Sequence, residues 1–261
     1  MSDFNINIYK LLLQALKDNA YSFFTFANYI TFEKQGLKSE SRIVILRHDV
    51  DLLPNNSYRF AKIQAEYGLS STYNFRVVPE SWDEAIIRHI ADLGHEVGYH
   101  YENMDTCKGD IDKAWDDFRY NLDKLRKLVD VKTICMHGSP RSKFDNRDLW
   151  KKYDYRSLGI IGEPYYDVDF NRVFYLTDTG RRWDGWKVSV RDKVPQQEEW
   201  IKRGLVFHST DDIIKANEQS RLPEKIMFTF HPQRWYNNSF LWLKEFALQK
   251  IKNQIKRIII K

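Results

Sequence analysis

The chain has 261 residues, of which 43% are hydrophobic and 30% are charged, and its formal net charge is +5. This length suits one α/β barrel or two smaller domains, and the sequence has no stretch of the ~18 consecutive apolar residues that a membrane span needs. Lys and Arg alternate with Asp and Glu, so the sequence lacks the basic stripe of a nucleic-acid-binding protein.

The N-terminal residues and the small number of cysteines indicate the cellular compartment of the protein. The N-terminal residues lack a basic segment followed by an apolar one, so we expect no secretory signal. Cys107 and Cys135 are too few for a disulfide framework, which fits a reducing environment. We therefore expect a cytoplasmic protein without a membrane span; the sequence is silent on its oligomeric state.

Apolar periodicity predicts alternating helices and strands along the chain. The predicted helices cover residues 8–16, Phe23 to Phe32, 54–68, Trp82 to Leu93, 111–129, Arg147 to Lys152, 210–217 and a segment from Ser239 onward. The predicted strands cover Ile43 to Arg47, Ser71 to Val77, Glu96 to His100, Thr133 to Met136, Tyr155 to Ile161, Leu205 to His208 and Ile226 to Phe230. Residues 163–193 are predicted to hold short strands and a lid-like loop.

This alternation is typical of a parallel α/β sheet or barrel. The sequence has no linker rich in Gly, Pro or Ser between two halves and no internal repeat, so we predict a single domain over residues 1–261. Within it, residues 1–42 form an N-terminal helical segment packed on a barrel of residues 43–261.

Four of the predicted strands run directly into acid/base or metal-ligating residues. The first ends in Asp49 and Asp51, and later strands end in His100, His137 and His231. The carboxyl ends of strands in β/α folds meet at one edge, where ligands and catalytic groups gather. The repetition therefore predicts one shared active site.

Asp49 and Asp51 are two residues apart, so on a strand both side chains point to the same face. Two neighbouring carboxylates resist ionising together unless a cation lies beside them. We therefore predict a divalent metal, zinc foremost, held by Asp51, His100 and a third ligand, either His137 or Glu102. The alternative is that Asp51 only caps the next helix and Asp49 pairs with Arg47.

Other polar residues could act around this centre. His231 precedes Pro232, which ends its strand, and is the candidate general acid. Asp178 could orient His231, Arg182 could orient a carboxylate, or their loop could have no catalytic role. Arg141, in the loop after His137, could hold an anionic or hydroxyl group.

Aromatic residues beside polar clusters could bind sugar faces, since flat apolar rings with polar rims suit them. Trp183 and Trp235 are the candidates. Packing beneath loops is the equally open alternative. The predicted substrate-binding residues are thus Arg141, Asp178, Arg182, Trp183 and Trp235.

These motifs resemble the polysaccharide deacetylase (NodB-homology, carbohydrate esterase) family, in a divergent form. The resemblance rests on the segments 47–51, 94–100 and 228–231, in the family's order, and spans Ile43 to Trp235. It implies a distorted (β/α) barrel of about seven strands and a metal-dependent hydrolase that removes acetyl groups from N-acetylated sugars. Asp49 would be the general base, Asp51 and His100 would bind the metal, and His231 would be the catalytic histidine.

The chain also departs from the family pattern. Val50 separates two aspartates that are normally adjacent, and Met104 occupies the position of a second metal-binding histidine. His137 or Glu102 could supply the missing ligand. The expected substrate is an acylated sugar or sugar precursor of surface polysaccharide metabolism. The alternatives are an inactive relative that binds a glycan or nucleotide-sugar, and an unrelated amide or ester hydrolase.

Overall fold

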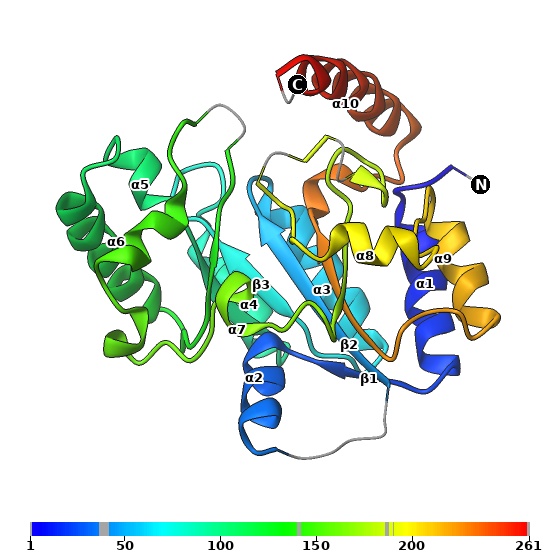
Figure 1. Ribbon diagram of the computed structural model, residues 1–261, viewed down its shortest axis with the longest axis horizontal. Coiled ribbons are helices and arrows are strands. Elements are labelled where there is room, and N and C mark those ends of the chain that lie inside the picture. Colours follow the sequence, from blue (N-terminus) through cyan, green and yellow to red (C-terminus); the bar gives the residue numbers. More distant parts are fainter. Residues whose placement is uncertain (1, 37–41, 140–141, 186–187, 190, 260–261) are drawn as a thin grey trace.

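The computed structural model describes residues 2–36, 42–139, 142–185, 188–189 and 191–259 (Figure 1). The α-helices are α1 (Ile6–Asp18), α2 (Phe26–Lys34), α3 (Pro54–Glu66), α4 (Glu84–Asp92), α5 (Asn103–Thr106), α6 (Ile111–Arg126), α7 (Pro164–Asp167), α8 (Gln197–Lys202), α9 (Thr210–Glu218) and α10 (Ser239–Ile259). Short 3-10 helices cover Asn146–Lys151, Tyr155–Leu158 and Pro232–Arg234. None of the helices described is long and apolar enough to cross a bilayer.

Seven strands form one parallel sheet. They are β1 (Tyr21–Phe24), β2 (Arg42–Val50), β3 (Thr72–Phe75), β4 (Glu96–Tyr101), β5 (Ile134–Met136), β6 (Phe174–Thr177) and β7 (Lys225–Phe230). Their order is β5-β4-β3-β2-β7-β6, and β1 pairs with β2. Among the described residues β5 and β6 are the end strands of this order and do not pair with each other. The curled sheet is therefore an open, distorted barrel. The predicted α/β fold of about seven strands is confirmed.

β2 lies at the centre of the sheet, and two different strands pair with successive halves of one of its edges. β1 pairs with its first half, from Arg42 to Ile45, and β3 pairs with its second half, from Arg47 to Val50. β7 pairs along the other edge. Every residue of β2 after Arg42 is buried, which is the pattern of a parallel strand covered on both faces.

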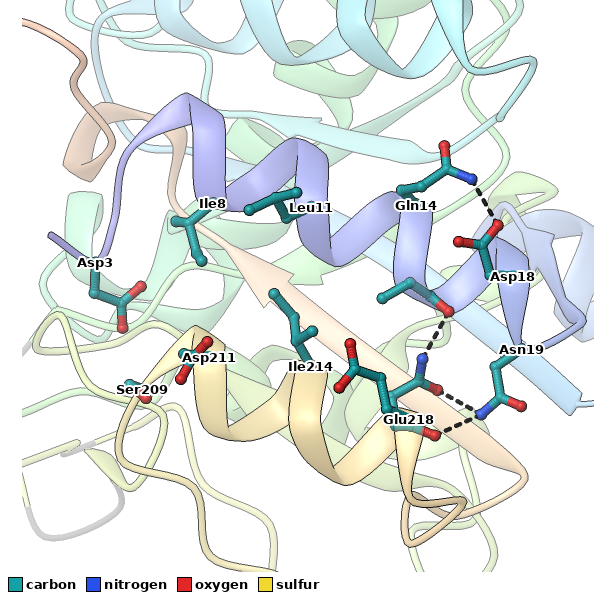
Figure 2. A pocket seen from close by; sticks show the side chains of 12 residues that line it. Asp3, Ile8, Leu11, Gln14, Asp18, Asn19, Ser209, Asp211, Ile214 and Glu218 are labelled. Atoms are coloured by element: carbon teal, nitrogen blue, oxygen red, sulfur yellow. Dashed lines mark hydrogen bonds between the residues drawn. The ribbon is translucent and has the colours of Figure 1, made fainter. Parts of the chain in front are cut away.

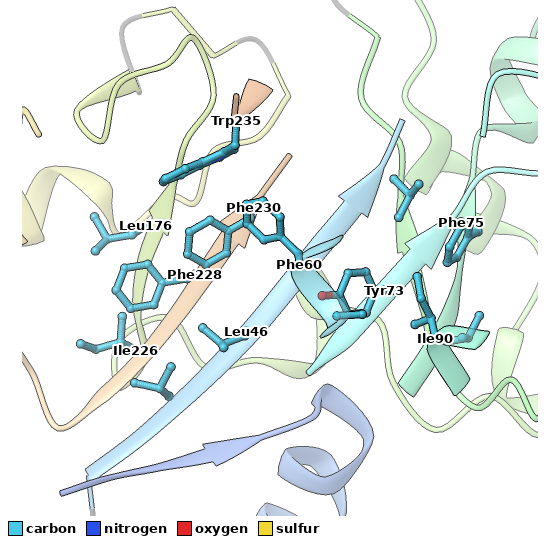
Figure 3. Close-up of a cluster of buried hydrophobic side chains, with 14 of the residues drawn as sticks. Leu46, Phe60, Tyr73, Phe75, Ile90, Leu176, Ile226, Phe228, Phe230 and Trp235 are labelled. Atoms are coloured by element: carbon cyan, nitrogen blue, oxygen red, sulfur yellow. The ribbon is translucent and has the colours of Figure 1, made fainter. Parts of the chain in front are cut away.

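The core is dominated by aromatic side chains between the sheet and its helices. Figure 3 shows part of it, where Phe228 and Phe230 of β7 meet Leu46 of β2, Tyr73 of β3 and Trp235. His48 lies inside this cluster, with its ring stacked 4.3 Å from Tyr73 and 5.4 Å from Phe230. It is a buried core residue despite its place between Arg47 and Asp49.

Several predicted elements differ from the structure. Residues 1–42 are not only helical, because β1 adds a strand where a helix from Phe23 was predicted. Thr25 then caps α2, accepting a hydrogen bond from the Asn28 amide, so the helix begins at Phe26. Residues 205–208 are not a strand, and Tyr155–Leu158 is a 3-10 helix. Both predictions rested on short apolar runs, which do not distinguish a strand from a packed loop.

Candidate active site

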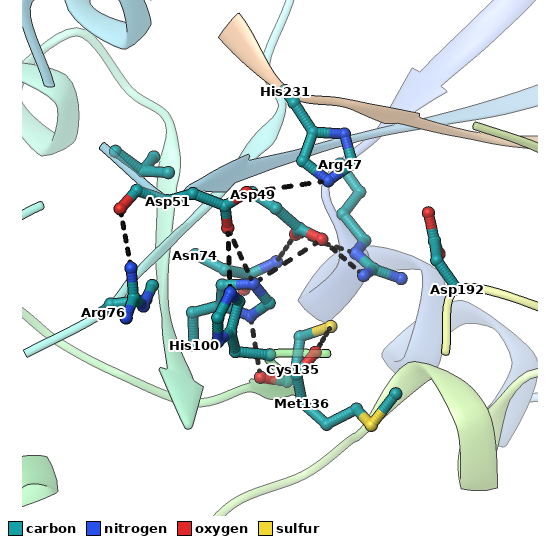
Figure 4. Close-up of polar contacts among 12 residues, drawn as sticks. Arg47, Asp49, Asp51, Asn74, Arg76, His100, Cys135, Met136, Asp192 and His231 are labelled. Carbon is teal, nitrogen blue, oxygen red and sulfur yellow. Dashed lines mark hydrogen bonds and ion pairs between the residues drawn. The ribbon is translucent and has the colours of Figure 1, made fainter. Parts of the chain in front are cut away.

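The residues predicted from the strand ends converge on one pocket of about 640 Å³. Asp49, Asp51, His100, His137 and His231 all line it, and they come from the carboxyl ends of β2, β4, β5 and β7. Figure 4 shows Asp51 and His100 pointing toward each other, with His231 above them. The parallel register explains the convergence, because it brings the strand ends to the same edge.

Asp51 is surrounded by imidazole nitrogens. Its Oδ1 lies 3.5 Å from Nε2 of His100 and 3.7 Å from Nε2 of His137, and its Oδ2 lies 3.9 Å from Nε2 of His231. Burial alone would raise the pKa of Asp51. The three imidazoles beside the carboxylate outweigh burial and hold that pKa well below the ordinary value.

The outer nitrogens of two of these histidines are fixed by acceptors. His100 Nδ1 lies 3.0 Å from the Cys135 carbonyl oxygen, and His137 Nδ1 lies 2.8 Å from Glu102 Oε2. A neutral ring so placed carries its proton on Nδ1, which turns the Nε2 lone pair toward Asp51. Such outer partners are typical of metal-ligating histidines. Glu102 therefore acts through His137, and it is also paired with Arg76 at 2.8 Å.

These residues have the chemistry of a divalent-cation site. The Nε2 atoms of His100 and His137 both face Asp51 Oδ1, which is buried without a hydrogen-bond partner among the described residues. Tetrahedral zinc with bonds of about 2.1 Å places neighbouring ligand atoms about 3.4 Å apart. The separations of 3.5 and 3.7 Å from Asp51 to His100 and His137 match that spacing.

A second cluster of ligand-type atoms lies beside the first. Asp49, His100 and Cys135 offer one atom each within 4.8 Å of one another. Burial raises the pKa of the Cys135 thiol well above its ordinary value, so the thiol stays protonated and is a poor ligand. Asp51, His100 and His137 are the better set.

Asp49 is bound by Arg47, as the alternative interpretation held. The guanidinium donates from Nε to Asp49 Oδ1 at 2.9 Å and from Nη2 to Oδ2 at 2.6 Å, and Asn74 Nδ2 donates to Oδ1 at 3.1 Å. Burial opposes ionisation, but Arg47 and His100 hold the pKa of Asp49 below its ordinary range. The capping half of that alternative is wrong, since α3 is capped at Leu53 without a side-chain bond.

Gly98 on β4 makes room for this arrangement. A Cβ at that position would lie 2.3 Å from Asn74 Oδ1 and 3.2 Å from the Thr133 carbonyl oxygen. We expect Gly98→Ala to displace the Asn74 amide and to lower the free energy of unfolding by about 1–3 kcal/mol. Urea denaturation of Gly98→Ala, Asn74→Ala and the double variant checks this. The second substitution should cost less in the presence of the first, and strictly additive losses would contradict the steric explanation.

Asp178 fixes the position of His231 through two contacts. The His231 Nδ1 lies 2.5 Å from Asp178 Oδ1, and the His231 backbone N–H donates to Asp178 Oδ2 at 2.9 Å. Trp235 Nε1 and Arg234 Nη1 donate to the same carboxylate at 2.7 and 3.2 Å. The bond to Nδ1 leaves the His231 Nε2 facing Asp51 and the pocket.

The predicted substrate-binding residues need correction. Asp178, Trp183 and Trp235 are 0%, 3% and 0% exposed, so they offer no surface to a sugar. Trp183 Nε1 donates to Thr210, and both indoles pack among core aromatics. Arg182 pairs with Asp184 at 2.7 Å and is not among the lining residues. Arg141 lies outside the described residues.

Other lining residues had no signal in the sequence. Arg191 and Asp192 reach the pocket from a loop, Gln233 and Arg234 from the 3-10 helix after β7, and further residues from α10. Asp192 is half-buried, and it accepts hydrogen bonds from Thr177 at 2.5 Å and from Thr179 at 2.7 Å. Loop residues without a strand or helix pattern cannot be placed near a site from one sequence alone.

A larger groove, of about 780 Å³, lies elsewhere on the molecule (Figure 2). It runs between α1 and α9 and is lined by Ile8, Leu11, Ile214 and several acidic side chains. Asn19 crosses it by donating to the Asn217 carbonyl at 2.7 Å. It contains none of the strand-end histidines, so the smaller pocket is the candidate active site.

No family model and no curated protein matches the sequence. Among solved structures, a Streptococcus pyogenes deacetylase in complex with acetate is 16% identical, with 59% of this chain and 70% of that chain covered and a TM-score of 0.46. A family 4 carbohydrate esterase from Bacillus anthracis is 11% identical, with 94% and 86% covered and a TM-score of 0.43.

A CE4 family pseudoenzyme from Bacillus anthracis is also similar in part. It is 13% identical, with 82% of this chain covered and a TM-score of 0.45, and this chain spans 63% of its length. We therefore base the function of this protein on the residues of its own pocket.

Proposed function

We propose that the protein is a metal-dependent hydrolase that removes the acyl group from an N-acylated sugar or sugar precursor. The observation that supports this most is the convergence of three imidazole Nε2 atoms on Asp51, at 3.5 to 3.9 Å, within a pocket. Asp51, His100 and His137 would hold the ion. His137 would supply the ligand that a second histidine supplies in the family pattern, at the position that is Met104 here. When bound, a divalent ion supplies Lewis acidity that polarises an acyl oxygen and makes water more acidic.

The residues of the chain would divide the proton transfers. Water adds to the acyl carbon, and Asp49 takes the proton that the water releases. The Arg47 pair keeps Asp49 ionised at neutral pH, although it also weakens Asp49 as a base. His231 gives the proton on Nε2 to the leaving amine nitrogen as the C–N bond breaks, and Asp178 stabilises the protonated ring.

Arg47 offers one further contact to the substrate. Its Nη1 is buried, lines the pocket, and has no hydrogen-bond partner in the described part of the chain. An unpaired buried donor is costly, so a ligand oxygen placed there would be favoured. We propose that Arg47 Nη1 receives a substrate oxygen. The two free thiols, Cys107 and Cys135, suit the reducing cytoplasm in which we place the enzyme.

Elemental analysis of the purified, unchelated chain tests the proposal, run beside acetate release from a panel of N-acetylated sugars and nucleotide-sugars. We expect about one equivalent of a divalent ion, zinc foremost. His100→Ala should lose it, and Asp49→Asn should keep it but lose turnover. His208→Ala, at an exposed histidine outside the pocket, is the matched control and should keep both.

Two outcomes would contradict the proposal. One is an ion retained in full by both His100→Ala and Asp51→Ala. The other is a wild-type chain that binds no zinc, cobalt, manganese or nickel after incubation, which would favour a protein that only binds a glycan.

A further inference from the structure

The last helix, α10, has polar residues on the side that faces the protein and apolar residues on the side that faces away, the reverse of an ordinary surface helix. Such helices bury their apolar stripe and expose their polar residues. In α10 the residues on the protein side include Gln249, which is 5% exposed, and Asn253, whose Nδ2 donates to the Gly180 carbonyl at 2.9 Å. Trp242 anchors the other end by donating to the Asp3 carbonyl at 2.6 Å.

The opposite side of α10 is apolar and uncovered in the structure. We call it the outer face; it consists of Phe240, Leu241, Leu243, Leu248 and Ile251, which are 43–74% exposed. With 3.6 residues per turn, these five positions fall within one half of the helix circumference. Together with Ile255, which also lines the pocket, they are most of the large hydrophobic side chains exposed in the described parts of the chain. Such a contiguous apolar patch marks a protein or membrane contact.

The charge of α10 favours an anionic surface. The helix carries five basic residues and a single acidic one, Glu245, which lines the pocket and is only partly exposed. Lys244 is exposed within the outer face, four residues from both Phe240 and Leu248. A second copy packed on this face would bury Lys244 without an acidic partner from α10, which is costly. At a membrane its ammonium group can reach lipid phosphates while its neighbours enter the apolar layer.

We propose that the outer face of α10 binds the surface of an anionic membrane. The helix would lie in the interface and not cross the bilayer, since no described helix is apolar enough to span it. Figure 1 shows α10 lying beyond the carboxyl end of β2, at the edge of the molecule. It also supplies Glu245, Gln249 and Lys252 to the pocket lining, so binding holds the pocket beside the lipid headgroups.

Vesicle co-sedimentation of the full chain tests this. We expect the partition coefficient on vesicles of phosphatidylcholine with phosphatidylglycerol to exceed that on pure phosphatidylcholine by about tenfold or more, and to fall with added salt. Leu248→Asp should lower it about tenfold, because a charge replaces a leucine that the membrane would bury. Leu11→Asp is the matched control: Leu11 on α1 is 46% exposed and Leu248 is 43% exposed, yet Leu11 lies off the outer face. It should change the coefficient by less than about twofold.

Lys244→Glu provides a second variant at an exposed site and should lower the preference for anionic vesicles without a change in the circular dichroism spectrum. The proposal is overturned if the wild-type chain does not bind anionic vesicles, or if Leu248→Asp binds them as well as Leu11→Asp does. A dimer in sedimentation velocity that Leu248→Asp dissociates would also overturn it, by assigning the outer face to a second copy.

Discussion

Asp178→Asn is expected to lower turnover by about 10²- to 10⁴-fold while metal content stays unchanged. Asp178 receives four donors, from the His231 backbone and ring, Trp235 and Arg234. An asparagine amide group would turn its own N–H atoms toward one of these donors. His231 would then lose the acceptor that keeps its proton on Nδ1 and supports the protonated ring. Steady-state kinetics with the best substrate of the sugar panel measures the loss.

A structural role for Asp178 would give a different pattern. In the His231→Ala background, Asp178→Asn should cause little further loss, because groups that act as a unit are non-additive. Trp235→Phe removes one donor to Asp178 but leaves its bond to His231, and serves as the control for disturbed packing. Independent, multiplicative losses in the double variant would show that Asp178 acts on something other than His231.

Stability is expected to fall steeply in mild acid because of His48. Its Nδ1 lies 3.1 Å from the Thr72 carbonyl oxygen and its Nε2 lies 3.0 Å from the Gln64 amide nitrogen, so the neutral ring is satisfied. Protonation would add a hydrogen to His48 Nε2, which would then face the N–H group of the Gln64 amide. Burial lowers the pKa of His48 to about 3, from 6.5 when exposed. The stabilisation is therefore complete above about pH 6.5 and is lost as the pH falls toward 3.

From pH 7 to pH 5 this group alone should lower the free energy of unfolding by about 2 kcal/mol, and by about 4–5 kcal/mol over the whole window. Urea denaturation at several pH values measures the slope. His48→Phe suits the space between Tyr73 and Phe230 and should flatten the slope, even where its stability at pH 7 is lower. An unchanged slope in His48→Phe would assign the acid sensitivity to other groups, such as the buried His95, whose pKa burial also lowers.

The sequence was sufficient to predict which residues meet in the pocket. Asp49, Asp51, His100, His137 and His231 lie at or just after the ends of strands, and parallel strands bring their ends together whatever the loops do. The choice between His137 and Glu102 could not be made, because it depends on which atoms face Asp51. In the structure His137 Nε2 does so, and Glu102 binds its other nitrogen.

The errors have a common physical origin in side-chain burial. Trp183 and Trp235 have polar neighbours in sequence, which suggested sugar contacts, yet their indole N–H groups are satisfied by Thr210 and Asp178 inside the fold. The position of Asp178 depends on the pairing of β6 with β7, and β6 lies in a segment for which the sequence predicts short strands and a loop but not their pairing. Residues two apart on a strand share a face, so the Arg47–Asp49 pair is one of the two interpretations that the sequence allows.

The central position of β2 has a consequence for synthesis of the chain on the ribosome. β2 pairs with β7 from Ile43↔Lys225 to His48↔Phe230, so the partner of one whole edge is made about 180 residues later. At roughly 5–20 residues per second, this edge waits about 10–40 seconds before it can be paired. During that interval an apolar strand that carries Asp49 has an open edge, the kind of species that recruits chaperones. The strand that positions Asp49 is thus also open to mispairing during translation.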